Sequence, residues 1–128
     1  MYTIVDGKTM LDDFKHEQTV VFEEEDGLVC FNGCSHSGVD IAIREVRKAF
    51  PNKKIKAYIG GFHMMGIMGA STCSYSKKEV QSVAKKLLEL TDAKFFSGRC
   101  TGTVAYGWLK EVLGDRLESF CSGKVFEV

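Results

Sequence analysis

The chain alternates between two kinds of hydrophobic periodicity, and this alternation limits its fold more than any other feature. Short apolar runs predict strands, and apolar residues spaced three or four apart predict amphipathic helices. The predicted strands cover 17–24, 28–32, 55–59, 94–97, 118–121 and 124–128, with a short strand at the start, and the predicted helices cover 39–50, a segment after Ser76, and 103–113. This order indicates an α/β layer with right-handed crossovers.

Local signals mark where several of these elements begin and end. Asp26-Gly27 is a hairpin signal, so the acidic run at 23–26 is expected at a solvated hairpin tip rather than to be a recognition tail. Pro51 stops the first helix. The segment S-K-K-E, from Ser76 to Glu79, predicts a capping box at the start of the second helix.

Length, charge and cysteine content narrow the classes of function. The 128 residues predict a single domain, 1–128, and 17 basic residues balance 17 acidic ones, which argues against a nucleic-acid partner. No apolar run reaches the roughly 20 residues that cross a bilayer, so we expect no membrane partner. The N-terminus has no signal-peptide core, and the five cysteines lack C-x-x-C spacing. We therefore expect reduced thiols in a cytoplasmic protein.

Three glycine-bearing segments each follow a predicted strand. They cover 33–38, 60–63 and 98–102. Segments that leave the C-terminal ends of parallel strands gather at one rim of the sheet, where ligands bind. We therefore expect two of the three histidines and two of the five cysteines to converge there.

Cys34 and His36 lie two residues apart in the first of these segments. In extended backbone their side chains would lie on one side, about 6–7 Å apart along the chain, and could approach one metal ion. Thiolate and imidazole suit zinc or iron. The alternative is a small buried cysteine beside a histidine that caps the next helix.

His63 is the third candidate metal ligand, because the two glycines before it permit close approach to a ligand. The segment 64–75, rich in Met, Gly and Ser, is expected to be an irregular loop that acts as a lid or binding element. A flexible surface loop beside a packed His63 is the alternative. His16 has charged neighbours and is expected at the surface.

Arg99, Cys100, Thr101 and Gly102 precede the third predicted helix. With Thr101 as the N-cap, free amides and a guanidinium group would form a pocket for a small anion such as phosphate or a carboxylate. A structural cap beside a solvated arginine is an equally good interpretation.

Four ordered segments carry a resemblance to known proteins: D-D-F-x-H-E-Q at 12–18, L-V-C-F-N-G-C-S-H-S-G at 28–38, I-G-G-F-H at 59–63 and C-T-G at 100–102. Together they resemble the C-terminal half of metallo-β-lactamase-fold hydrolases, in the branch of dihydropterin-phosphate synthase-like proteins. The resemblance implies half of an αββα sandwich, with one mixed sheet and about three helices on one face.

The resemblance also implies a metal, zinc or another divalent transition ion, near Cys34, His36 and His63. The family's H-x-H-x-D-H motif cannot be present, because the chain has only three histidines. Relatives usually carry a histidine ligand before C-T-G, where this chain has Arg99. A guanidinium group offers no lone pair to zinc. The chain alone is therefore expected to be catalytically incompetent.

A half sandwich would leave one sheet face open. Leu28, Val29, Cys30 and Phe31 are apolar on both faces of their strand, so the open face would be apolar. We expect a second copy in a two-fold homodimer, or a separate chain carrying the N-terminal half, to cover it.

Three functions follow from these patterns. The first is a hydrolase-like subunit that acts on, or binds, a phosphate- or ester-bearing small molecule with a partner. The second is a non-catalytic anion-binding or interaction module formed by a homodimer. Thiol redox chemistry at Cys34 or Cys100 is the third, because a nearby helix N-terminus lowers the pKa of a thiol.

Overall fold

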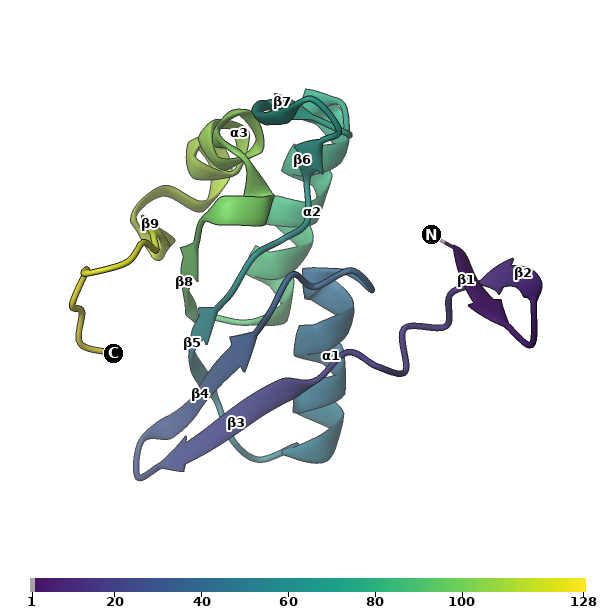
Figure 1. The fold of residues 1–128 in the computed structure, drawn as a ribbon. Coiled ribbons are helices and arrows are strands. Elements are labelled where there is room, and N and C mark those ends of the chain that lie inside the picture. Colours follow the sequence, from purple (N-terminus) through teal and green to yellow (C-terminus); the bar gives the residue numbers. More distant parts are fainter. Residues whose placement is uncertain (1) are drawn as a thin grey trace.

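A five-stranded mixed sheet forms the centre of the molecule (Figure 1). The computed structural model describes residues 2–128, apart from the side chain of Arg99. The sheet has the order β3-β4-β5-β8-β9 and contains β3 (Thr19–Glu24), β4 (Gly27–Asn32), β5 (Ile55–Ile59), β8 (Lys94–Ser97) and β9 (Leu117–Ser119). The β3–β4 pair is an antiparallel hairpin, and β4, β5, β8 and β9 run parallel. The predicted α/β class is confirmed.

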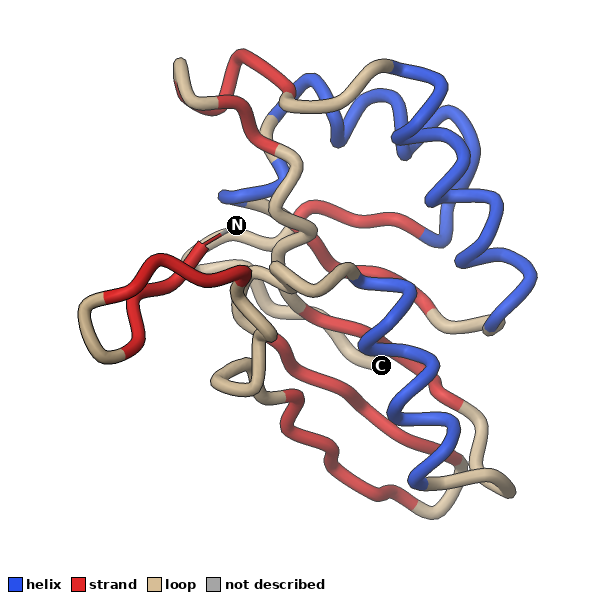
Figure 2. Tube along the Cα trace, turned by 90° about the vertical axis from the view of Figure 1, so that its right-hand side faces the viewer, coloured by secondary structure: helices blue, strands red, loops and turns tan. Residues whose placement is uncertain are grey.

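Three helices cover one face of this sheet, as expected (Figure 2). They are α1 (Val39–Ala49), α2 (Lys77–Leu90) and α3 (Thr103–Leu113), and the short 3₁₀ turns η1 (Arg99–Thr101) and η2 (Gly114–Arg116) flank α3. The helices bury Leu28, Tyr58 and Phe95 of the sheet in the main core. No helix within residues 2–128 is long and apolar enough to cross a bilayer.

The predicted end signals of these elements act as expected. Ser76 and Glu79 form the reciprocal hydrogen bonds of a capping box at the start of α2. The acidic run lies at the tip of the β3–β4 hairpin, where Lys53 contacts Glu23 at 2.9 Å and Lys56 contacts Asp26 at 2.6 Å. The acidic run therefore forms ion pairs with lysines of the same chain at the hairpin tip, as expected for a solvated turn rather than a recognition tail.

The chain's last segment packs on the opposite sheet face through one side chain. The Phe126 ring stacks on Phe96 of β8, with centroids 4.0 Å apart and planes 9° apart, over a small cluster with Val29, Ala57 and Ile59. The prediction of a strand at 124–128 is therefore wrong. The Phe126 ring, rather than backbone hydrogen bonds to a neighbouring strand, holds the segment on the sheet. The strand predicted at 118–121 lies at 117–119 instead, where Leu117 is fully buried.

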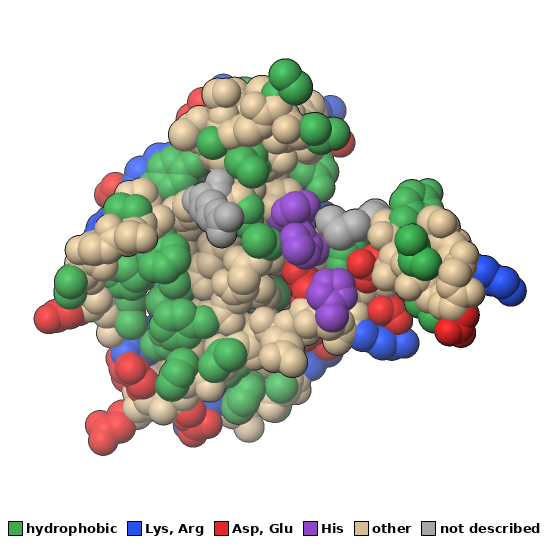
Figure 3. Space-filling view, viewed as in Figure 1, with side chains coloured by type: hydrophobic (Ala, Val, Ile, Leu, Met, Phe, Trp, Pro, Cys, Tyr) green, Lys and Arg blue, Asp and Glu red, His purple; other side chains and the backbone are tan. Residues whose placement is uncertain are grey.

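Part of this outer face stays apolar and exposed. Val20, Phe22 and Phe31 face the same side, and the rings of Phe22 and Phe31 meet edge to face at 5.5 Å. Their exposed fractions are 53%, 57% and 40%. Hydrophobic side chains gather on the lower left of the molecule in Figure 3. A partner for this face remains a prediction.

Two small hairpins lie outside the main sheet. The first joins β1 (Tyr2–Val5) to β2 (Lys8–Leu11) through the turn at Asp6-Gly7. A single short strand was expected at the start, and the structure has this hairpin of two strands instead. The second joins β6 (Met65–Gly66) to β7 (Gly69–Cys73). The prediction of an irregular loop at 64–75 is therefore wrong for residues 65–73, which form this hairpin. Gly69, with a φ of 100°, allows the chain to turn and pair its backbone groups.

Candidate metal centre

The loops that follow β4, β5 and β8 meet at one end of the sheet, as their glycines predicted. The Gly61 amide donates to the Gly33 carbonyl at 2.8 Å, and the Met64 amide donates to the Cys100 carbonyl at 3.0 Å. These bonds join the three loops directly. Side chains from distant parts of the sequence therefore share one rim.

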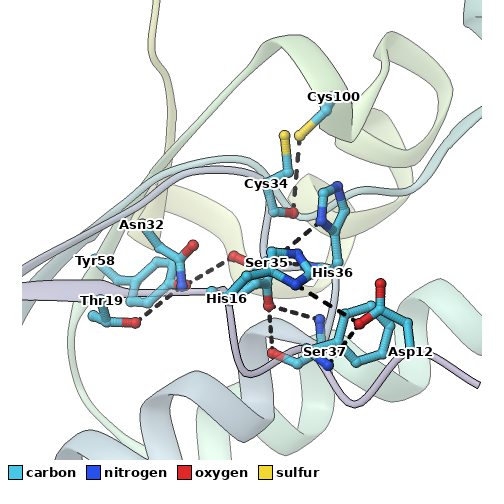
Figure 4. A network of polar contacts seen from close by, with 12 residues as sticks. Asp12, His16, Thr19, Asn32, Cys34, Ser35, His36, Ser37, Tyr58 and Cys100 are labelled. Atoms are coloured by element: carbon cyan, nitrogen blue, oxygen red, sulfur yellow. Dashed lines mark hydrogen bonds and ion pairs between the residues drawn. The ribbon is translucent and has the colours of Figure 1, made fainter. Parts of the chain in front are cut away.

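One side chain from each loop contributes to a cluster of potential metal ligands. Cys34, His63 and Cys100 place one ligand atom each within 4.8 Å of one another. Figure 4 shows the Cys34 and Cys100 thiols close together. Cys34 and His63 were predicted metal ligands, whereas Cys100 was assigned to the anion pocket. Its place in the loop after β8, like that of Cys34 in the loop after β4, is the signal that could have identified it.

Gly61 makes room for the Cys100 thiol. A Cβ atom on residue 61 would lie 2.0 Å from Cys100 Sγ and 3.3 Å from the Gly33 carbonyl oxygen. No side chain fits there while the thiol keeps its position. The glycine of the I-G-G-F-H segment therefore sets how closely the second and third loops approach.

His36 lies beside this cluster. Its ring meets the His63 ring edge to face, with centroids 4.1 Å apart and planes at 86°. The extended backbone that would place Cys34 and His36 on one side does not occur. Ser35 has a φ of 54° and turns the loop, and its hydroxyl lies 2.8 Å from the Tyr58 hydroxyl in a buried hydrogen bond. His36 therefore contacts the cluster through the ring of His63.

Glu17 holds the loop that carries His36. Its carboxylate accepts hydrogen bonds from the His36 amide at 2.5 Å, the Ser37 amide at 2.9 Å and the Ser37 hydroxyl at 2.6 Å. Burial opposes ionisation of this carboxyl, but these hydrogen bonds outweigh burial and lower its pKa. The sequence reasoning missed this role, although Glu17 belongs to the D-D-F-x-H-E-Q segment.

Burial shifts the pKa values of His63 and Cys100 in opposite senses for metal binding. Burial and the neighbouring His36 lower the pKa of His63, so its imidazole is neutral near pH 7 and keeps a lone pair. Burial raises the pKa of Cys100, whose thiol would ionise on coordination. His36 Nδ1 is buried, lies 3.4 Å from Glu17 Oε1 and makes no hydrogen bond within the described residues.

Thr101 and Gly102, two residues of the predicted anion pocket, have separate structural roles. Thr101 is buried, accepts the Phe62 amide at 3.0 Å and shares a 2.6 Å hydrogen bond with Ser97. The N-cap of α3 is Gly102, so the prediction of Thr101 as N-cap is wrong, because the Thr101 hydroxyl joins two loops instead. The side chain of Arg99 lies outside the described residues, and an anion at this turn stays a prediction.

A cavity of about 190 Å³ opens next to the two clustered histidines. His36 and His63 form part of its wall, and the other lining residues come from the loop after β4, the segment after β5, Tyr75 and the first turns of α1 and α2. The chain's histidines (purple) lie near one another on the face shown in Figure 3. His16 is the most exposed of them and lies 3.7 Å from Asp12, in keeping with the surface position expected.

Comparisons with known proteins give consistent results. No family model matches the chain. A curated relative from Methanocaldococcus jannaschii, 7,8-dihydropterin-6-methyl-4-(beta-D-ribofuranosyl)-aminobenzene-5'-phosphate synthase, is 28% identical over 127 residues, which are 99% of this chain and 40% of the relative. A crystal structure of a metal-dependent hydrolase of the β-lactamase superfamily superposes with a TM-score of 0.83 and 29% identity, over 99% of this chain and 46% of that one.

The fold and the comparisons together define a metallo-β-lactamase-superfamily-like protein. Within that class, the chain resembles the dihydropterin-phosphate synthase-like branch over nearly its whole length, as its motifs predicted. It spans less than half the length of both relatives, which is consistent with the expected half-domain.

Proposed function

We propose that this chain carries part of the metal site of a metallo-β-lactamase-fold hydrolase that acts on a phosphate- or ester-bearing small molecule. The observation that carries the proposal is the convergence of Cys34, His63 and Cys100 from three separate loops. The metal is a divalent transition ion, with zinc as the first choice, because thiolate sulfur and imidazole nitrogen are the ligands that zinc prefers in proteins.

The donor set fits an ion that keeps open positions. Three protein ligands on zinc leave room for water or substrate, whereas a closed structural site has four. When bound, such an ion supplies a Lewis acid and lowers the pKa of water. The chain's own residues position this site. Glu17 fixes the His36 loop through three hydrogen bonds, and His36 packs against His63 and limits how its ring can turn.

The proposal includes additional metal ligands from sequence outside these 128 residues. The two relatives are more than twice as long as the matched segment, so their remaining lengths hold residues that this chain does not match. A separate chain, or the rest of a longer one, would supply additional ligands. The name of the Methanocaldococcus jannaschii relative contains a 5'-phosphate product, which favours a phosphate-bearing substrate.

Zinc titration of the purified protein against a chromophoric chelator tests the proposal. We expect one zinc per chain, with the affinity lowered at least about tenfold in each of Cys34→Ala, His63→Ala and Cys100→Ala. Cys121→Ala is the matched control, because Cys121 is exposed and lies outside the cluster. Absence of stoichiometric zinc, or equal affinity in the three variants and the control, would contradict the proposal.

A second candidate is an interaction module that uses the outer sheet face. The exposed Val20, Phe22 and Phe31 favour it, because soluble proteins seldom leave such a continuous apolar patch uncovered. Sedimentation velocity of the wild type and of Phe22→Lys would test the homodimer version. Dimers in the wild type and monomers in the variant would support it, and monomers in both would count against it.

A further inference from the structure

We propose that Cys34 and Cys100 form a reversible disulfide that prevents metal binding. Oxidation by a peroxide joins the two sulfur atoms, and reduction by a small thiol separates them again. The disulfide itself requires only the two side chains. Its effect on the metal rests on the proposed function, because the same two sulfurs belong to the candidate metal centre.

The two thiols lie close together although their strands are not neighbours. β5 separates β4 from β8 in the sheet, and strands two places apart lie about 10 Å from each other. The loops after β4 and β8 nevertheless converge, and the Sγ atoms of Cys34 and Cys100 lie within 4.8 Å of each other. Figure 4 shows the two thiols side by side, with Cys100 Sγ 3.9 Å from the Cys34 carbonyl oxygen.

Two glycines at the end of β5 permit this convergence. A Cβ atom on Gly60 would overlap the Asn32 carbonyl oxygen at the end of β4, and a Cβ atom on Gly61 would overlap Cys100 Sγ. Side chains at these positions would hold the two flanking loops apart. The Gly61 amide also donates to the Gly33 carbonyl at 2.8 Å, directly beside Cys34. The fold therefore holds the two cysteines at close range.

Closure of the disulfide requires a small movement. Sulfur atoms in a disulfide are about 2.05 Å apart, so the two Sγ atoms must approach by less than about 3 Å. Each thiol can turn about its Cα–Cβ bond from one staggered position to another, which changes this separation without moving the backbone. Both cysteines are half-buried, so a small oxidant can reach them, whereas Cys30 is buried in the main core.

The oxidation takes place in two balanced steps. The sulfur of one thiol attacks the peroxide, an S–O bond forms, the O–O bond breaks, and the leaving oxygen takes up the thiol proton as water. The sulfur of the second thiol then attacks this sulfenic acid. The S–S bond forms, the S–O bond breaks, and the leaving hydroxyl group takes up the second proton as water. The two thiols together lose two electrons, which the peroxide gains.

The disulfide and the metal exclude each other. A metal ion binds the thiolate form of cysteine, and a disulfide has no thiolate to offer. Oxidation therefore removes two of the three candidate ligands and leaves only His63. Zinc sites in proteins use three or four protein ligands, so one imidazole does not retain the ion. The oxidation state of the pair thus sets whether the metal centre can be filled.

Treatment of the metal-free protein with hydrogen peroxide tests the disulfide. We expect the protein to lose two of its five free thiols, dithiothreitol to restore both, and peptide mapping to join Cys34 to Cys100. Because this mapping uses the wild type, it does not depend on how variants fold. Thiols oxidised only to sulfinic acid, or cross-links only between chains, would overturn the proposal.

Serine variants assign the cross-link to this pair. Cys34→Ser and Cys100→Ser should each abolish the loss of two thiols to an internal disulfide. Cys73→Ser is the matched control, because Cys73 is also half-buried but lies outside the cluster, and it should retain the cross-link. An internal disulfide that persists in Cys34→Ser or Cys100→Ser, or that disappears in Cys73→Ser, would contradict the assignment.

Zinc separates this inference from the proposed function. Zinc-loaded protein should form the cross-link at least about tenfold more slowly than metal-free protein, because the ion holds both sulfurs. Oxidised protein should bind no zinc until it is reduced. Stoichiometric zinc binding without any cross-link would overturn this inference alone, and equal zinc binding before and after oxidation would overturn the effect on the metal. A cross-link in protein that never binds zinc would contradict the proposed function and leave the disulfide standing.

Discussion

Glu17 and Ser37 are joined by two hydrogen bonds to the same oxygen, at 2.9 Å from the amide and 2.6 Å from the hydroxyl. The two residues lie 20 positions apart, on either side of the β3–β4 hairpin. The contact fastens the segment before the sheet to the loop that carries His36. The position of His36 therefore depends on a residue outside the metal-ligand loops.

Replacing Glu17 by Gln should destabilise the protein by about 1–3 kcal/mol, because a neutral amide accepts less strongly from the His36 and Ser37 donors. Urea unfolding followed by circular dichroism measures the change. Glu23→Gln is the control, since Glu23 makes an exposed ion pair with Lys53 that contributes less than about 1 kcal/mol. Equal losses of unfolding free energy in the two variants would show that Glu17 does not anchor the His36 loop.

Adjacent glycines in the I-G-G-F-H segment should respond differently to a methyl group. In Gly61→Ala the obstacle is the Cys100 thiol, which can rotate away, so we expect weaker zinc binding with the fold retained. In Gly60→Ala the obstacle is the Asn32 carbonyl oxygen at 2.4 Å, which belongs to the backbone, so we expect a stability loss of about 2 kcal/mol or more. Zinc affinity and urea midpoints of both variants check this contrast, and a Gly61→Ala protein with wild-type zinc affinity would refute it.

Truncation of Phe126 should uncover the outer sheet face. Phe126→Ala removes the ring stacked on Phe96, and we expect a loss of about 1–2 kcal/mol and increased binding of a hydrophobic dye. Val125→Ala is the neighbouring control, because Val125 is 91% exposed. If the two variants behave alike, the C-terminal segment does not protect this face.

Cys30 should make the protein less stable in alkali. Burial raises the pKa of its thiol from 9.0 to about 11, so the folded state retains a proton that the unfolded chain releases. Its contribution to stability is complete below about pH 9 and is lost as the pH rises through about 11. Unfolding free energies between pH 8 and 11 should fall less steeply in Cys30→Ala than in the wild type. Cys121→Ala, at an exposed position, should follow the wild-type curve.

Elements with strong periodicity were predictable from the sequence. The strands at 55–59 and 94–97 and the helix at 103–113 lie where expected, because apolar spacing and glycine boundaries agree there. The 64–75 hairpin was missed because its strands are short and rich in small residues, so the pattern resembles a loop. The end of the chain was misassigned because alternation cannot distinguish a paired strand from a segment anchored by one aromatic ring.

The candidate site was predictable in outline only. Glycines after parallel strands place Cys34, His63 and Cys100 at one rim, and this follows from topology alone. Which side chains face one another depends on local backbone angles, such as the positive φ of Ser35, that spacing does not reveal. The contact between Glu17 and the His36 loop depends on how the chain enters the sheet, which no local pattern encodes.

Cys34 and Cys100 lie 66 positions apart in the sequence, and this separation has a kinetic consequence. Their thiols meet only after β4, β5 and β8 have all paired in parallel, and closing such long loops makes this pairing slow. An ion that needs both thiols in their folded positions is therefore expected to bind late in the folding of this chain. Its capture would mark the end of the folding reaction, and a stopped-flow metal signal should lag behind the burial of the core.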